Sequence, residues 1–221
     1  MAMANWMVSP RFDMQSLRVG RASPVDVFED AIRGWILDYA ARLAGLDKPN
    51  SGMAVMVLLS AYPETIECYL TGRDSRDASK KFFRDGMKRI FPELADVPGP
   101  KLDSVCDDLR NGLYHGSMLK GTVVLEPEGA AIVYSAEEDA FRINPFAFLA
   151  RVQEHFVSYI GRLRASEPGD VELSNFTRFW QVRHGRALQT GHGEAAMARP
   201  EEEIVLSTAA PIDPARVTRM L

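Results

Sequence analysis

The chain contains few of the residues that define several classes of protein. Only two cysteines, Cys68 and Cys106, occur among 221 residues, so we expect neither a disulfide framework nor a cysteine-ligated zinc site. We interpret both as reduced, buried thiols of a cytoplasmic protein. The four histidines show no metal-ligand spacing with the cysteines or acidic residues. The sequence therefore predicts no metal and no cofactor.

Long apolar runs are also missing. The most apolar stretch, residues 52–62, has the sequence GMAVMVLLSAY, and it is too short for the roughly 20 residues that a transmembrane helix needs. The first residues lack the basic segment and apolar run of a signal peptide. We therefore expect a soluble, cytoplasmic protein that does not interact with membranes.

An overall positive charge is absent as well. Lysine and arginine number 26 against 30 acidic residues, which gives a formal net charge of −4. Contact with a nucleic acid would therefore have to come from a local patch. Hydrophobic residues make up 46% and charged residues 25% of the chain, as in ordinary globular proteins.

Helical periodicity begins after an irregular arm of residues 1–24, whose apolar residues predict that it packs on another part of the protein. Ser23 is a good N-cap and Pro24 a good first residue for a helix that ends at Gly45. Pro63 lies inside the next apolar pattern and predicts a kink or a break there.

Two further helices are indicated before the pattern changes. One begins at Ser75 or Ser79 and buries a set of apolar side chains, namely Phe82, Phe83, Met87 and Ile90. The next runs from Lys101 to about His115. Residues 121–143 then contain short β-branched runs separated by turn residues, which predict a small hairpin or a three-stranded meander.

The last long helix is expected to be capped by Asn144 and to begin at Pro145. After Gly169 we expect irregular structure. Residues 173–185 interleave aromatic residues with arginines, an arrangement that can stack on nucleic-acid bases, although docking on the bundle or on a second chain is the favoured interpretation. Residues 190–203 have the composition of a flexible linker.

These patterns predict a mainly α fold, an up-and-down bundle of four to five helices with a small β insertion before the last long helix. The expected organisation is an N-terminal arm over residues 1–24, a helical domain over residues 25–166 with its β insertion at about residues 121–143, and a partly flexible C-terminal extension over residues 167–221.

One stretch, DDLRNGLYHGSML at residues 107–119, gathers polar side chains at a helix end. Asn111 and His115 are four residues apart and can share one helix face. Arg110 adjoins them, Gly112 removes bulk between them, and Gly116 is a natural C-cap. The apolar residues of this helix face the core, so the polar group borders the buried stripe.

Two interpretations of this stretch remain open. In the structural interpretation, these residues only end the helix: a histidine in the last turn is favoured by the helix dipole, and arginine and asparagine are common near helix ends. The spacing of the residues alone favours this structural interpretation. In the chemical interpretation, His115 transfers protons, Arg110 stabilises phosphate charge and Asn111 orients either group. One histidine per chain is sparse for both acid and base, and a symmetric dimer would supply a second.

The segment LRNGLYHG resembles the Arg-x4-His signature of the HEPN superfamily, in which a polar residue, often asparagine, follows the arginine. The resemblance extends over roughly residues 25–165, and only residues 109–116 are specific. It implies a dimeric helical bundle whose motif faces the dimer cleft. It also implies metal-independent endoribonuclease activity, with Arg110 and His115 catalytic and Asn111 supportive.

Many members of this superfamily act in toxin–antitoxin or defence systems, so the resemblance also implies RNA as substrate and an antitoxin-like protein as partner. In one subgroup a modified tyrosine lies two residues after the histidine, whereas this chain has Ser117, which places that type of control in doubt. The alternative is a non-catalytic dimeric helical module that binds a nucleotide, RNA or a protein.

Other candidate residues lie outside the motif. The lysines and arginine at positions 80, 81, 84 and 88 (Lys80, Lys81, Arg84 and Lys88) form a basic stripe that could follow an RNA backbone, although a solvated helix face is favoured. Glu67 is a weak choice for an acid that orients His115, and Tyr114 is a weak supporting residue. We interpret the acidic residues Glu64, Glu67, Asp103, Asp107 and Asp108 mainly as helix-terminus and surface charges.

Overall fold

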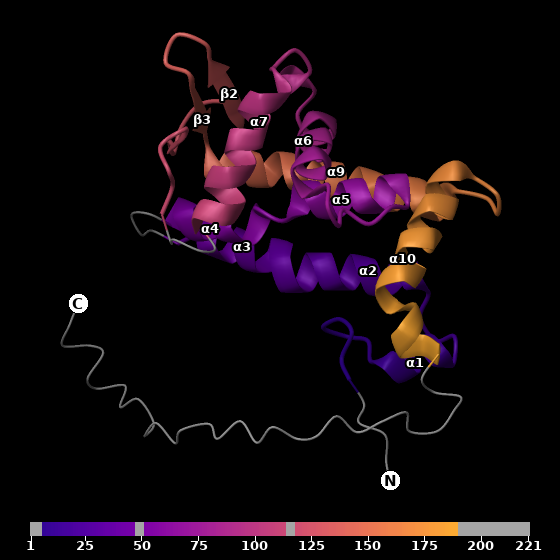
Figure 1. The fold of residues 1–221 in the computed structure, drawn as a ribbon. Helices are drawn as coiled ribbons and strands as arrows, with labels where there is room; N and C mark the ends of the chain where they lie inside the picture. The colour runs from indigo at the N-terminus through magenta and orange to yellow at the C-terminus, as the bar shows by residue number, and fades with distance from the viewer. Residues whose placement is uncertain (1–5, 47–50, 114–117, 190–221) are drawn as a thin grey trace, which may run out of the picture. The chain divides into compact units, whose positions relative to one another are not determined.

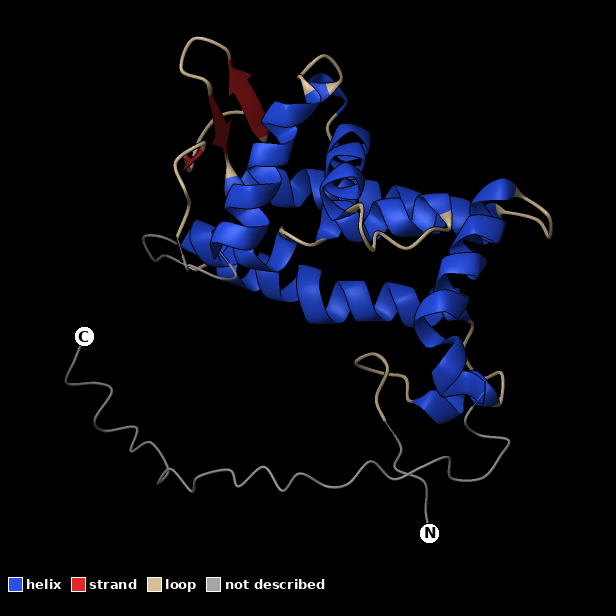
Figure 2. Ribbon diagram, viewed as in Figure 1, coloured by secondary structure: helices blue, strands red, loops and turns tan. Residues whose placement is uncertain are grey.

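A computed structural model describes residues 6–46, 51–113 and 118–189, with side chains described up to residue 185. Helices make up most of this part of the chain, and one small sheet lies beside them (Figures 1 and 2). The expected mainly α fold is therefore confirmed. Within the described ranges, no helix has both the length and the apolar character needed to cross a membrane.

The first long helical run consists of α2 (Pro24–Ile32), the π-helical turn η1 (Arg33–Leu37) and α3 (Asp38–Ala44). Ser23 accepts a hydrogen bond from the backbone N–H of Asp26, while the Asp26 side chain accepts one from the Ser23 backbone. This capping box satisfies backbone donors that a helix start leaves free. The predicted start at Pro24 and the end at Gly45 are confirmed.

The next helices are α4 (Ser51–Leu59), α5 (Tyr62–Thr71) and α6 (Ser79–Ile90). The chain breaks between α4 and α5, and Pro63 lies in the first turn of α5, so the predicted break is confirmed. The α5 and α6 helices pack closely because Gly86 has no side chain. A Cβ atom at Gly86 would lie 1.9 Å from the carbonyl oxygen of Pro63.

The short helix η2 (Pro92–Leu94) leads into α7 (Gly99–Cys106), which continues as a second π-helical turn, η3 (Asp107–Gly112). The predicted helix from Lys101 is thus confirmed, although its last part is π-helical. Leu109 and Leu113 are buried, so this turn borders the core as expected.

The sheet contains β1 (Val123–Leu125), β2 (Ile132–Ser135) and β3 (Ala140–Ile143) in the order β1-β3-β2. The antiparallel pairing of β2 with β3 confirms the predicted hairpin. The three-stranded meander is wrong, because β1 pairs in parallel with β3 rather than with its neighbour in sequence. The turn residues indicated where the strands end, but they could not indicate that β1 pairs with β3.

The two C-terminal helices are α9 (Pro145–Ala165) and α10 (Val171–Gln189). Asn144 caps α9 through backbone N–H groups of the first turn, as predicted. The expectation of irregular structure after Gly169 is wrong for residues 171–189. Phe176, Phe179 and Trp180 are buried, and α10 packs on α5, so the aromatic residues of this segment belong to the core of the bundle.

The core is made of apolar side chains from α2, α4, α5, α6, α7, α9, α10 and the sheet, with Phe83, Phe148 and Phe156 among its most buried members. The N-terminal arm packs on the helical bundle through α2, as expected. The buried carboxylate of Asp30 accepts hydrogen bonds from the Ser9 hydroxyl and the Arg11 backbone, both at 2.7 Å.

Replacement of Gly86 tests the close contact between α5 and α6. Gly86→Ala should lower the free energy of unfolding by about 1–3 kcal/mol, because the added methyl group collides with the Pro63 carbonyl oxygen. Gly161 on α9 is the matched control, since a Cβ there meets no atom within 4 Å among the described residues. Gly161→Ala should raise stability by up to about 1 kcal/mol. Urea unfolding followed by circular dichroism measures both, and equal effects would contradict the packing described.

Candidate functional site

The arginine of the motif lies at the wall of a cavity of about 420 Å³. Side chains from α2, η1, α5, η3 and α10 line it, together with Val8 of the arm and Asp74 and Ser75 of the α5–α6 connection. Its walls are partly apolar and partly polar. The cavity therefore combines the usual features of a small-molecule or nucleotide site, an apolar interior with a few converging polar groups.

Arg110 is fixed by two contacts through one terminal nitrogen. Its Nη1 donates a hydrogen bond to the Ser79 hydroxyl and forms an ion pair with Glu64 Oε2. Neither contact uses Nε or Nη2 of Arg110, and its side chain remains 36% exposed. Among the described residues these donors have no partner, and a fixed, partly exposed guanidinium with such donors is suited to bind a phosphate or carboxylate.

Glu64 is the acidic residue that positions Arg110. Its side chain is buried, and it accepts hydrogen bonds from Ser75 at 2.5 Å and from Ser79 at 3.1 Å. These donors and the Arg110 cation compensate the buried carboxylate. Glu64 lies in the first turn of α5, so its interpretation as a helix-terminus charge is confirmed, whereas its interpretation as a surface charge is wrong. Its serine partners were not identified from the sequence.

Glu67, the weak choice for an orienting acid, has a different partner. It is buried and forms an ion pair with Arg89 of α6, with an Oε2–Nε distance of 2.5 Å. It is not among the described residues that line the cavity. The interpretation of Glu67 as a surface charge is wrong, and its carboxylate is already engaged by Arg89.

Asn111 contacts its own helix rather than the cavity. Its amide donates to Asp107 Oδ1 at 3.0 Å, and Asp107 also pairs with Lys80 at 2.6 Å. The hydrogen bond from Lys80 holds the pKa of Asp107 below its usual value. Asn111 therefore belongs to an exposed charge cluster beside Arg110.

His115, Tyr114, Gly116 and Ser117 lie outside the described residues, so their predicted roles stay predictions. The structure does explain Gly112. A Cβ there would lie 2.7 Å from the backbone oxygen of Met118, so glycine permits the chain to return close to η3. A sequence pattern cannot indicate this contact.

The basic stripe on α6 is largely neutralised. Lys80 pairs with Asp107, Lys81 with Asp85 and Arg84 with Asp103. The fourth member, Lys88, donates to the backbone oxygen of Ala95 at 2.7 Å. Because each cation already has a partner, the stripe offers a phosphate less net charge than its sequence suggests.

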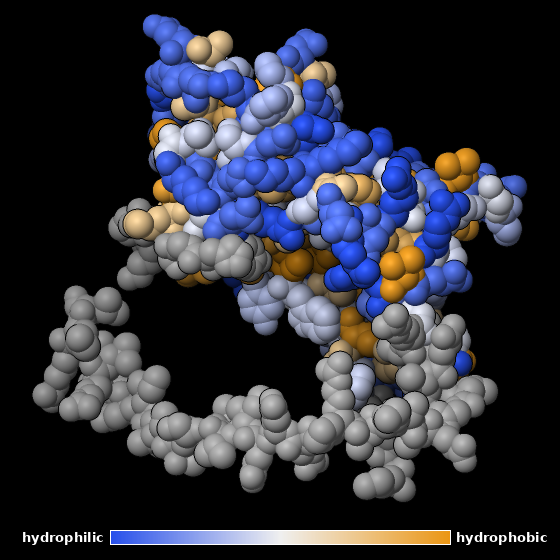
Figure 3. Space-filling view, viewed as in Figure 1, coloured by the Kyte–Doolittle hydropathy of each residue, from blue (hydrophilic) through white to orange (hydrophobic). Residues whose placement is uncertain are grey.

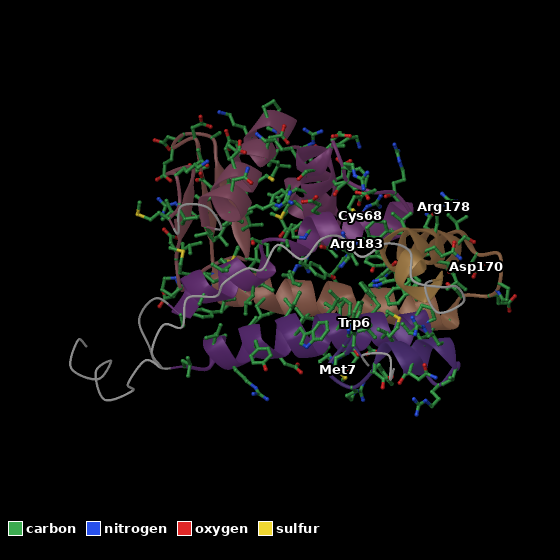
Figure 4. The ribbon with its side chains drawn as sticks, turned by 60° about the horizontal axis from the view of Figure 1, so that its bottom comes forward. Trp6, Met7, Cys68, Asp170, Arg178 and Arg183 are labelled. Carbon is green, nitrogen blue, oxygen red and sulfur yellow. The ribbon has the colours of Figure 1, made fainter. Side chains whose placement is uncertain are left out.

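The cavity thiol is not an activated nucleophile. Burial raises the pKa of the Cys68 thiol, and burial raises that of Cys106, behind Arg110, to about 11. Both thiols are therefore protonated at neutral pH, and a thiol is a poor nucleophile. Figure 4 labels Cys68 on α5 together with Arg183 on α10, another residue of the cavity wall.

An aromatic wall completes the cavity and was missed as a site feature. Phe28, Tyr69, Phe179 and Trp180 line it, and the ring of His184 lies against Trp180 with centroids 4.1 Å apart. The interleaved aromatic residues and arginines of residues 173–185 were the sequence feature that could have indicated this wall. The structure shows that the segment both packs on the bundle and contributes to the cavity.

Among the described residues, no group of three or more histidine, cysteine, aspartate or glutamate side chains could hold a metal ion. Comparisons with protein-family models, curated proteins and solved structures find no significant match for this chain.

Asp108 holds the chain that returns to the sheet after the motif, and its removal is a test of this region. Its buried carboxylate accepts hydrogen bonds from the backbone N–H groups of Lys120, Thr122 and Val123 and from the Thr122 hydroxyl. Asp108→Ala should lower the free energy of unfolding by about 2–4 kcal/mol, because several donors lose their acceptor. The control is Asp103→Ala, which removes the partner of Arg84 near the surface and should cost at most about 1 kcal/mol. Equal losses in urea unfolding would show that the Asp108 contacts do not stabilise this connection.

Proposed function

We propose that this chain is a metal-independent endoribonuclease of the HEPN type that acts as a homodimer in a toxin–antitoxin or defence setting. The observation that carries the proposal is the placement of Arg110. Its guanidinium is fixed by Glu64 and Ser79 at the wall of a cavity and is still partly exposed.

The conformation of η3 supports a functional role for this arginine. Arg110 and Asn111 lie on a π-helical turn, Asp107–Gly112, and such turns are rare and often occur at functional sites. The π-helical turn places Arg110 toward α5 and the cavity while Asn111 stays with Asp107. A helix can end without a π-helical turn of this kind.

Arg110 would act on the phosphate during RNA cleavage. In the proposed reaction the ribose 2′ oxygen attacks the adjacent phosphorus, a new P–O2′ bond forms and the P–O5′ bond breaks. The products are a 2′,3′-cyclic phosphate and a 5′-hydroxyl end. The spare N–H donors of Arg110 stabilise the charge that develops on the phosphate oxygens.

Two protons move in this reaction. A base removes the proton of the 2′-hydroxyl, and an acid supplies one to the departing O5′. The resemblance assigns this work to His115, because an imidazole can both accept and donate a proton near neutral pH. A second chain would supply the other histidine, which is why the proposal includes a homodimer.

The contacts of Arg110 with Glu64 and Ser79 are also consistent with the alternative function, a non-catalytic module that binds a nucleotide, RNA or a protein. The Arg110–Glu64 pair joins η3 to α5, and Ser79 adds α6. An ion pair that connects three elements can be purely structural. The two functions are distinguished by whether loss of Arg110 removes cleavage or only stability.

Cleavage of single-stranded RNA by the purified chain, assayed in EDTA, tests the proposal. Arg110→Ala and His115→Ala should each lower the cleavage rate at least about a hundredfold, since each removes a group that acts on the transition state. The wild-type products should carry 2′,3′-cyclic phosphate ends, identified by mass spectrometry.

Arg89→Ala is the matched control, because Arg89 also pairs with a buried glutamate of α5 but lies apart from the described cavity residues. It should retain wild-type cleavage at a temperature where each variant is folded. Unchanged cleavage in His115→Ala, or an equal loss in Arg89→Ala, would contradict the proposed site. If the wild type does not cleave and Arg110→Ala only lowers the melting temperature, the non-catalytic module is favoured.

A further inference from the structure

The cavity beside Arg110 has an aromatic side that the cleavage chemistry does not use. Phe28 of α2, Tyr69 of α5 and Trp180 of α10 contribute buried rings to its wall. Trp35 also lines the cavity but is 46% exposed. A large exposed ring at the edge of an aromatic-lined cavity is an open surface on which a flat ligand can stack.

Both π-helical turns of the described chain contribute to this cavity. Trp35 lies on η1 (Arg33–Leu37) and Arg110 on η3 (Asp107–Gly112), and both residues line it. These two turns are far apart in sequence and belong to different helical runs. Because π-helical turns often occur at functional sites, their convergence supports a binding role for the cavity as a whole.

The charges at the cavity suit an anion attached to the flat ligand. Arg110 lines one part of the wall, and Arg183 of α10, exposed to solvent, lines another. His184 adds a ring rather than a charge, because burial and the neighbouring Arg183 lower its pKa. Two carboxylates also line the cavity. Glu64 is compensated by Ser75, Ser79 and Arg110, and Asp74 accepts a hydrogen bond from the Arg76 backbone and forms an ion pair with its side chain.

The polar and apolar residues are also distributed unevenly over the surface. On the face shown in Figure 3, hydrophilic side chains cover most of α6 and α7, whereas apolar side chains show between α5 and α2. The aromatic rings and arginines that line the cavity, rather than the paired cations of α6, form the better surface for a nucleic acid.

We propose that this cavity binds one unpaired nucleobase of single-stranded RNA by stacking on Trp35, with the adjoining phosphates held by Arg110 and Arg183. This inference rests on the proposed ribonuclease function and adds to it a subsite that binds one base of the substrate. A cavity of about 420 Å³ falls within the usual range for ligand sites. A base in a duplex is covered by its neighbours, so only an unpaired base can enter.

The test measures binding separately from cleavage. A fluorescently labelled single-stranded oligoribonucleotide with 2′-O-methyl groups cannot undergo attack by a 2′-hydroxyl, and its binding to the full chain is followed by fluorescence anisotropy. Trp35→Ala should weaken binding at least about fivefold, since stacking on one aromatic side chain typically has that effect. Trp35→Phe keeps a ring and should retain most of the affinity.

Tyr39→Ala is the control for Trp35→Ala. Tyr39 follows one turn later, on α3, is 53% exposed and is not among the described residues of the cavity wall. Its removal should leave the affinity for the oligonucleotide unchanged. A loss equal to that of Trp35→Ala would overturn the stacking site.

Arg183→Ala should weaken binding and lower the slope of log Kd against log salt by about 0.7, the value for one phosphate contact to a single strand. Arg178→Ala is its control, because Arg178 lies five residues earlier on α10, toward Asp170 in Figure 4, and is not among the described cavity residues. An unchanged slope in Arg183→Ala, or the same change in both variants, would overturn the assigned phosphate contact.

Two competitors identify the class of ligand. Unlabelled single-stranded RNA should displace the probe at a lower concentration than an RNA duplex of the same sequence. It should also do so at a lower concentration than AMP, which offers one base and a single phosphate, whereas the proposed site contacts phosphates through two arginines. Equal competition by the duplex or by AMP would overturn the assignment to single-stranded RNA. No binding of the probe would overturn it as well.

Failure of this inference is distinguishable from failure of the proposed function. Wild-type cleavage with unchanged probe binding in Trp35→Ala would remove the base site and leave the ribonuclease in place. Probe binding that depends on Trp35, in a chain that does not cleave unmodified RNA, would support the RNA site and remove the catalytic function.

Discussion

The carboxylate of Glu64 imposes the strongest constraint on the region around the motif. It is buried where α5, α6 and η3 meet, and a carboxylate in such a place destabilises the fold unless hydrogen bonds and an opposite charge compensate it. Ser75, Ser79 and Arg110 provide that compensation. The arginine is therefore held in one position by the stability of the bundle itself. Among the described residues no partner occupies its other N–H donors, so a ligand could meet them without any further ordering of the side chain.

The N-terminal arm and α10, two segments outside a minimal helical bundle, also contribute residues to the cavity wall. The arm contributes Val8, and it is held to α2 by the buried Asp30. The α10 helix contributes Trp180 and Arg183 after packing its other aromatic rings on α5. The aromatic core thus continues into the cavity wall, so α10 contributes both to the core and to the lining of the cavity.

The sequence predicted those helix starts that are determined by residues next to them in the chain. Ser23 with Pro24, and Asn144 with Pro145, define helix starts through capping alone. The parallel pairing of β1 with β3 depends on contacts distant in sequence, so no local pattern could predict it. The site shows the same limit: Glu64 and Glu67 lie one helical turn apart on a nearly fully buried α5, and only the tertiary structure shows which of them pairs with Arg110.

The most direct test of the proposed RNA site is to identify which residues contact RNA. Ultraviolet cross-linking of a 2′-O-methyl single-stranded RNA containing 4-thiouridine, followed by trypsin digestion and mass spectrometry, locates the contact. The account predicts cross-links in residues 34–42 and 179–183, the peptides that contain Trp35 and Trp180. Cross-links confined to α6, within residues 80–89, would place RNA on the basic stripe and contradict the account.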